Sequence, residues 1–184
     1  MRSRSPLLAI TIPILMLAAG CAQPARVDRM IASQSPQSAA LPAQSPLHRA
    51  IGTTVVEGGR TTIPIFTPEV DNDAFISALR ESLNRNGLLA GTAAPARYTL
   101  QASLIRADQP VRGLNKTVLT TIRYRLRDVA SGRVVYDEQI DSRFTVTFDD
   151  EPIASSRHRQ ANEGAMRQNL EKLIERLRAF RPAV

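Results

Sequence analysis

Hydrophobic and polar residues alternate along three segments between residues 97 and 146, and this pattern predicts three β-strands. In residues 97–107 the apolar positions are Tyr98, Leu100, Ala102 and Leu104. In the next segment, VLTTIRYRLRDV, they are Ile122, Tyr124 and Leu126. The third segment, RVVYDEQIDSRFTVTF, follows a turn at Ala130-Ser131-Gly132 and places Tyr136 and Ile140 on one face. Each strand therefore has one face for a core and one face for water.

Two other segments repeat apolar residues at helical spacing. The first contains Phe75, Ala78, Leu79 and Leu83. It can begin at Thr67-Pro68 or at Asp71-Asn72, and Asn86-Gly87 supplies the left-handed residue that ends a helix. The second predicted helix lies near the end of the chain, and its apolar stripe consists of Met166, Leu170, Leu173, Ile174 and Leu177. Such a stripe favours a core-facing helix over one that lies on a membrane surface.

The N-terminal part of the folded region predicts a β-hairpin. Residues 51–57 and 61–66 are rich in β-branched side chains, and Gly58-Gly59 lies between them. Together the elements predict one small α+β domain in the order β(β)-α-β-β-β-α. We expect an antiparallel sheet of about four to five strands with two amphipathic helices packed on one face.

Arginines occupy the water-facing positions of the central strand, namely Arg123, Arg125 and Arg127. In a hairpin closed at residues 130–132 they lie across from Asp137 and Asp141, so at least one Arg–Asp pair is directly opposed. This favours a solvated, internally paired sheet face. The alternative is a basic strip that contacts an anionic ligand or a partner, formed by Arg112, Lys116, Arg123, Arg125 and Arg127.

The first 21 residues have the three parts of a secretory signal. Arg2 and Arg4 precede an apolar run from Leu7 to Leu17, which is followed by small residues and by Cys21, the one cysteine of the chain. The run is about half the roughly 20 residues that span a bilayer, which disfavours a transmembrane anchor. Leu17-Ala18-Ala19-Gly20-Cys21 resembles the lipobox of bacterial lipoproteins, and the alternative is a chance cysteine beside an ordinary cleavage site.

The resemblance to a lipobox implies cleavage between Gly20 and Cys21 and attachment of lipid to the Cys21 thiol. Two or three acyl chains would hold the protein on a membrane that it does not cross. Ala22, in place of aspartate, implies the outer membrane with the domain facing the periplasm, and the periplasmic face of the inner membrane is the alternative.

Residues 1–20 are thus the predicted signal peptide, and residues 48–184 the predicted periplasmic domain. Between them, residues 21–47 are expected to be the lipidated cysteine and a flexible tether, because 18 of the 26 residues after Cys21 are Ala, Gln, Ser or Pro. A short turn of helix near Val27 to Ile31 would be compatible with such a tether. The full chain has a formal net charge of +7. Export to the periplasm separates the protein from nucleic acid, so no nucleic-acid partner is expected for this charge.

No pattern of catalytic or metal-binding residues is visible. The two histidines, His48 and His158, are far apart in the sequence, and there is no HExxH or GxSxG motif. Three adjacent acidic residues at 149–151 precede a proline and indicate an exposed turn. We therefore expect no enzymatic activity, no cofactor and no bound metal.

The segments DAFISALRESLNRNGLL, RYTLQASLIRADQP, VLTTIRYRLRDVASGRVVYDEQI and ANEGAMRQNLEKLIERL resemble a group of small uncharacterised bacterial envelope lipoproteins. More loosely, the order of elements is similar to α/β periplasmic lipoproteins that assist lipopolysaccharide assembly or activate cell-wall synthases. These resemblances imply an accessory or structural lipoprotein that docks to an envelope protein. The alternative is a module that binds an anionic envelope ligand, either lipopolysaccharide or a glycan.

Overall fold

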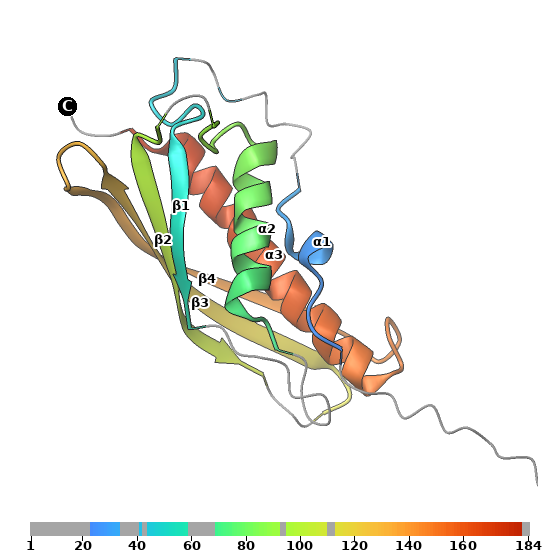
Figure 1. Cartoon of the computed structure of the whole chain (residues 1–184). Helices are drawn as coiled ribbons and strands as arrows, with labels where there is room; N and C mark the ends of the chain where they lie inside the picture. The colour runs from blue at the N-terminus through green and yellow to red at the C-terminus, as the bar shows by residue number, and fades with distance from the viewer. Residues whose placement is uncertain are drawn as a thin grey trace, which may run out of the picture.

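The computed structural model describes residues 23–33, 41, 44–58, 69–92, 95–109 and 113–181, which form one α+β domain (Figure 1). Within these residues four strands make one sheet in the order β1-β2-β3-β4, and the helices pack on one of its faces. This confirms the predicted fold class. The elements are α1 Val27–Met30, β1 Ile51–Glu57, α2 Asn72–Arg85, β2 Tyr98–Asp108, β3 Lys116–Asp128, β4 Val134–Val146 and α3 Ala154–Ala179.

The sheet is mixed, which corrects the expectation of an antiparallel sheet. Strand β1 pairs with β2 in parallel, whereas β2–β3 and β3–β4 are antiparallel pairs. The physical reason is the connection, because α2 carries the chain from the end of β1 back to the start of β2. The predicted second strand of the hairpin, residues 61–66, lies outside the described residues.

The local signals for α2 and for the three long strands are confirmed. Asp71 accepts a hydrogen bond from the backbone N–H of Ala74 at 2.6 Å and caps α2, which ends where Gly87 adopts a φ of 69°. The predicted apolar residues of α2 are all buried, as are Tyr98, Leu100 and Ala102 of β2 and Ile122, Tyr124 and Leu126 of β3. The inner face of the sheet and the helices thus share a large hydrophobic core, and a second, smaller cluster contains Val118, Val146, Ala161 and Ala165.

Helix α3 begins well before its predicted apolar stripe. All five residues of that stripe are buried, but the helix starts at Ala154 and also buries Arg157 and His158. Two features lock it to the sheet. Asn169 accepts from the Tyr124 hydroxyl and donates to the Ile140 carbonyl, both at 2.8 Å. Gly164 lies against the Phe144 ring so closely that an added Cβ would be 2.2 Å from Cδ1.

The described part of the predicted tether is packed on the domain, which corrects the expectation of a flexible segment. Residues 23–33, here named the N-terminal strap, run along α3 and α2 (Figure 1). The strap buries Ala25, Met30, Ile31 and Ala32, and the later residues Leu41 and Leu47 are buried as well. The average composition hid these apolar side chains, whose burial offsets the entropy of ordering the chain. The structure therefore extends the folded domain before residue 48.

Candidate functional site

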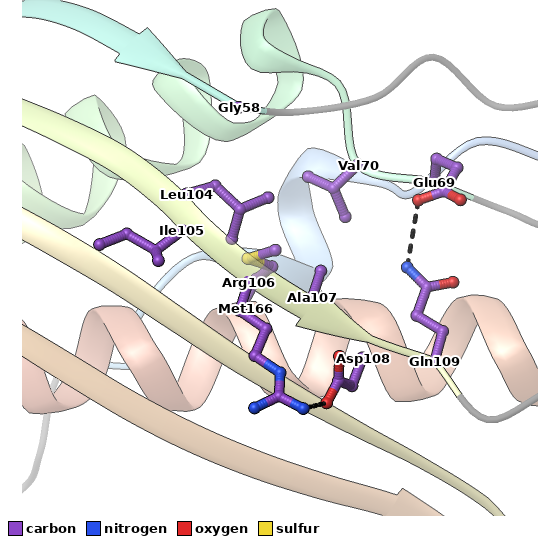
Figure 2. A pocket seen from close by; sticks show the side chains of 10 residues that line it. All are labelled: Gly58, Glu69, Val70, Leu104, Ile105, Arg106, Ala107, Asp108, Gln109 and Met166. Carbon is purple, nitrogen blue, oxygen red and sulfur yellow. Dashed lines mark hydrogen bonds and ion pairs between the residues drawn. The ribbon is translucent and has the colours of Figure 1, made fainter.

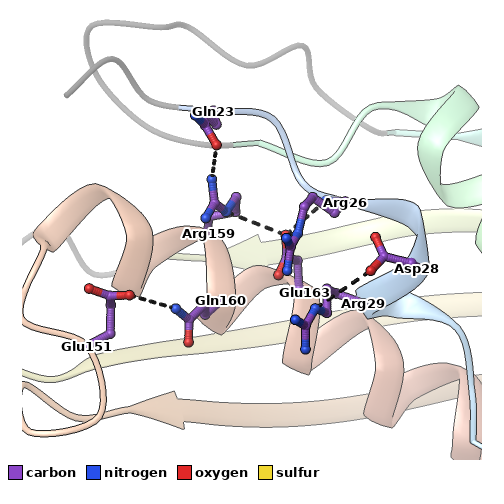
Figure 3. Close-up of polar contacts among 8 residues, drawn as sticks. All are labelled: Gln23, Arg26, Asp28, Arg29, Glu151, Arg159, Gln160 and Glu163. Atoms are coloured by element: carbon purple, nitrogen blue, oxygen red, sulfur yellow. Dashed lines mark hydrogen bonds and ion pairs between the residues drawn. The ribbon is translucent and has the colours of Figure 1, made fainter. Parts of the chain in front are cut away.

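A cluster of charged side chains holds the N-terminal strap to α3 (Figure 3). The backbone N–H of Arg26 donates to Glu163 Oε1 at 2.9 Å. The Arg26 and Arg159 side chains approach the same oxygen through Nε, at 3.8 and 3.6 Å. Arg159 Nη1 also donates to Gln23 Oε1 at 2.5 Å. The first described residue of the chain is thus tied to α3 by the same arginine that neutralises Glu163.

Glu163 is the centre of this cluster and is only 3% exposed. Burial raises the pKa of its carboxyl above the ordinary value, although the Arg26 amide and the two guanidinium groups favour the charged form. Farther along the strap, the backbone N–H of Ala32 donates to the buried Ser82 hydroxyl at 2.9 Å. Both ends of the strap therefore have a polar contact with the domain, with the buried Met30 between them.

The docked strap limits how far the predicted lipid attachment can be from the domain. One residue separates Gln23 from Cys21. Since consecutive Cα atoms are about 3.8 Å apart, the two Cα atoms are at most about 8 Å apart. Gly20 and Cys21 lie outside the described residues, so lipidation and cleavage stay predictions. Lipid on Cys21 would hold the domain at the membrane surface with almost no slack.

The outward arginines of β3 are engaged within the sheet. Arg123 donates to both carboxylate oxygens of Asp137, at 2.6 and 2.8 Å, and Arg125, directly opposite Asp137, donates to it at 3.2 Å. Arg127 donates to the Gly132 carbonyl at 2.5 Å. The hydrogen bond from Arg123 holds the pKa of Asp137 below its ordinary value. This confirms the prediction of at least one directly opposed Arg–Asp pair.

Lys116 does not lie on the same strip as these arginines, which corrects the predicted grouping. It is 6% exposed and shares the inner face of β3 with Val118 and Ile122. Because side chains alternate along a strand, a residue at an even position cannot join arginines at odd positions. Arg112, the remaining member of the predicted strip, lies outside the described residues.

Lys116 instead lies close to His158, at the start of α3. His158 is 5% exposed, and burial together with the charge of Lys116 lowers its pKa. The sequence around His158, SSRHRQ, looks solvent-exposed because it lacks an apolar stripe, so its burial was missed. In the described part of the chain, no group of three or more His, Cys, Asp or Glu residues could hold a metal ion.

A cavity of about 500 Å³ opens at the far end of β2 (Figure 2). The apolar residues that line it include Val70, Leu104 and Met166. The polar groups around it are paired with each other, since Arg106 binds Asp108, and Gln109 donates to Glu69 at 3.1 Å. Residues 59–68 connect two lining residues, Gly58 and Glu69, and lie outside the described part of the chain. We therefore assign no site to this cavity.

The structure also bears on membrane insertion and on the predicted acidic turn. No helix within the described ranges combines the length and the apolar character needed to cross a bilayer.

Asp149 and Asp150 are exposed in the turn between β4 and α3, as expected. Asp150 accepts from the backbone and the hydroxyl of Thr147, at 3.0 and 2.7 Å, which fixes the turn.

No family model and no curated protein sequence matches the chain. Solved structures do match. A "putative lipoprotein" from Caulobacter crescentus CB15 is 22% identical, with a TM-score of 0.50 over 73% of this chain and 92% of that one. XCC0632 from Xanthomonas campestris, of family-model DUF330, is 12% identical, with a TM-score of 0.54 over 78% and 91%. CT253 from Chlamydia trachomatis is 13% identical, with a TM-score of 0.50 over 71% and 95%. The chain therefore shares the fold of these proteins.

Proposed function

We propose that this chain is an accessory lipoprotein of the bacterial envelope, held on a membrane by lipid on Cys21. The observation that carries the proposal is the position of the lipobox-like segment, because it directly precedes a strap that is fastened to α3. Such a strap turns a lipid anchor into a rigid attachment for the whole domain. The fold shared with the Caulobacter crescentus protein, which carries the name of a lipoprotein, supports this assignment.

We place the lipidated protein at the outer membrane with the domain in the periplasm. The support is Ala22, since the lipoprotein resemblance connects a residue other than aspartate at this position with export to the outer membrane. The periplasmic face of the inner membrane remains the alternative location.

The domain's role in this proposal is to dock an envelope protein through the outer face of the sheet. No described helix covers that face, because α2 and α3 pack on the opposite one. Leu119 of β3 points outward there and is 40% exposed. Leu119 lies opposite Asp108 of β2 and Arg143 of β4, and an exposed apolar side chain among charged ones is typical of a protein–protein interface. The proposal includes no catalytic step.

The pairing of the arginines favours a protein partner over an anionic ligand. A phosphate or carboxylate would have to displace Asp137 from both Arg123 and Arg125. Replacing Arg123, Arg125 and Arg127 by glutamine should therefore leave the binding of purified lipopolysaccharide unchanged. Loss of that binding in the triple variant would favour the ligand-binding alternative.

Metabolic labelling with a radioactive fatty acid tests the anchor. The wild-type chain should incorporate label and Cys21→Ser should not. Equal labelling of both chains would refute lipidation at this residue.

Site-specific photo-crosslinking in intact cells tests docking. A crosslinker at Leu119 should capture one envelope protein that mass spectrometry identifies repeatedly. A matched crosslinker at Arg80, an exposed residue of α2, should not capture it. Identical products from the two positions, or none from Leu119, would refute docking through the sheet.

A further inference from the structure

Three exposed apolar side chains gather at one end of the domain. Leu114 and Ile153 are the two most exposed large hydrophobic residues of the described chain, at 72% and 60%, and Phe148 is 45% exposed. Leu114 lies two residues before the start of β3, while Phe148 and Ile153 lie between β4 and α3. Because β3 and β4 are antiparallel, the start of β3 and the end of β4 meet at the same end of the sheet. We name Leu114, Phe148 and Ile153 the apolar tip.

Direct contacts hold the two turns of the apolar tip together. The backbone N–H of Phe148 donates to Asn115 Oδ1 at 3.2 Å, which joins the turn after β4 to the turn before β3. The Arg157 guanidinium lies over the Phe148 ring at 5.4 Å, and the Arg157 backbone N–H donates to the Ile153 carbonyl at 2.8 Å. These contacts fix the backbone of both turns, so the apolar side chains of the tip are held in exposed positions.

The acidic residues beside the tip are largely engaged in the turn. Asp150 binds Thr147, and Glu151 accepts from the Ile153 backbone at 3.0 Å and from Gln160 at 2.9 Å (Figure 3). Asp149 is exposed. The tip is therefore an apolar surface with a polar and partly acidic rim. Such a surface fits the boundary between the headgroups and the acyl chains of a zwitterionic leaflet, because carboxylates stay hydrated there while apolar side chains leave water.

The N-terminal strap places the predicted lipid at this same end. Gln23 is bound to Arg159, which lies six residues beyond Ile153 and hence about 9 Å farther along the axis of α3. The Cα of Cys21 is at most about 8 Å from that of Gln23. Figure 1 shows the start of the strap beside the start of α3. A bilayer that holds acyl chains on Cys21 is therefore within reach of the apolar tip.

We propose that the apolar tip inserts into the interface of the bilayer that holds the lipid on Cys21, so that the lipid and the tip attach the domain at two points. This inference rests on the proposed lipidation. It also orients the domain. The turn that contains Val129 lies at the opposite end of β3, a strand of 13 residues that spans about 40 Å. The outer face of the sheet then extends away from the membrane, where a partner can reach it.

The absence of tryptophan from the sequence permits a direct depth measurement. Phe148→Trp adds one fluorophore at the tip and keeps an aromatic ring below Arg157, and Ile153→Trp is a second reporter on the other side of the turn. Val129→Trp is the matched control, because Val129 is 54% exposed at the far end of β3. Each variant is purified as the full-length lipidated protein and reconstituted in phosphatidylcholine vesicles, with and without bromine on the acyl chains.

Bromine should quench tryptophan emission at positions 148 and 153 at least twofold, and at position 129 by less than a tenth. One outcome is that the protein carries the fatty-acid label and binds vesicles while bromine quenches positions 148 and 153 no more than position 129. That result would refute insertion of the apolar tip and leave the proposed lipidation intact. Absence of label at Cys21 would overturn both. Protection of position 148 from iodide without quenching by bromine would show that a second copy of the chain covers the tip, which would also overturn the bilayer as its occupant.

Discussion

Replacing Met30 with alanine should destabilise the whole domain, because Met30 is fully buried although it lies in a segment with the composition of a linker. Truncation of a buried methionine to alanine costs about 2–5 kcal/mol, depending on how far the surroundings collapse. The strap lies at the edge of the core, between α2 and α3, where collapse is easier, so we expect about 2–3 kcal/mol. For a domain of this size the melting temperature should fall by about 4–12 °C.

Thermal and urea unfolding followed by circular dichroism measure this loss. The matched control is Asp28→Ala in the same helical turn, because the Asp28 side chain is 71% exposed and its ion pair with Arg29, at 3.7 Å, lies at the surface. That variant should change the unfolding free energy by less than about 0.5 kcal/mol. If Met30→Ala unfolded at the same temperature and urea concentration as Asp28→Ala, the strap would not be docked, and residues 23–33 would be part of a flexible tether.

Three further substitutions test contacts of α3. Gly164→Ala should lower the melting temperature in calorimetry, since overpacking against Phe144 costs about 1–3 kcal/mol and exceeds the roughly 1 kcal/mol gained in helix preference; in a Phe144→Ala background this loss should disappear. Asn169→Leu should cost about 2–4 kcal/mol in urea unfolding by leaving the buried Tyr124 hydroxyl without its partner, and adding Tyr124→Phe should recover part of the loss, whereas additive losses would contradict the contact. Burial raises the folded-state pKa of Glu163, so the contribution of this residue to the free energy of unfolding should be lost as pH rises from about 4.3 through that raised pKa. The loss should be absent in Glu163→Gln, and parallel curves of unfolding free energy against pH for the two proteins would contradict the raised pKa.

The elements that were predictable from the sequence are those in which one periodic signal coincides with a local stop signal. In α2 the apolar spacing of Phe75, Leu79 and Leu83 lies between a capping Asp71 and the left-handed Gly87, and the structure has all of these features. The β3–β4 hairpin was equally clear, because alternation predicted both faces and the turn at residues 130–132 predicted that at least one Arg–Asp pair would be directly opposed, which the structure shows to be Arg125 and Asp137. Parallel pairing of β1 with β2 was not predictable in this way, because it depends on a crossover between distant segments.

Burial of polar residues was the signal that the sequence could not provide. Arg157, His158, Asn162 and Glu163 are all at least 95% buried in the first half of α3, where polar side chains replace an apolar stripe. The fold supplies a distant partner for Glu163, which accepts a hydrogen bond from the Arg26 backbone across 137 positions of sequence, whereas the Arg157 guanidinium donates to the nearby Glu151 and Pro152 carbonyls. The grouping of Lys116 with the β3 arginines failed for a simpler reason, since strict alternation alone would have placed it on the inner face.

The strap and the apolar tip together change what a lipid anchor on Cys21 would do. A free tether of 26 residues would let the domain search a shell about 28 Å deep above the bilayer, whereas a strap docked from Gln23 onward confines it to one height and one orientation. A protein partner in or on the same membrane would then meet the outer face of the sheet at a fixed distance from the lipid. Docking would cost less orientational entropy than it costs a freely rotating domain. If Met30→Ala weakens the docking of the strap, it should also weaken the crosslink from Leu119 in a chain that is still folded and still carries label on Cys21. An unchanged crosslink in that variant would show that the orientation set by the strap plays no part in docking.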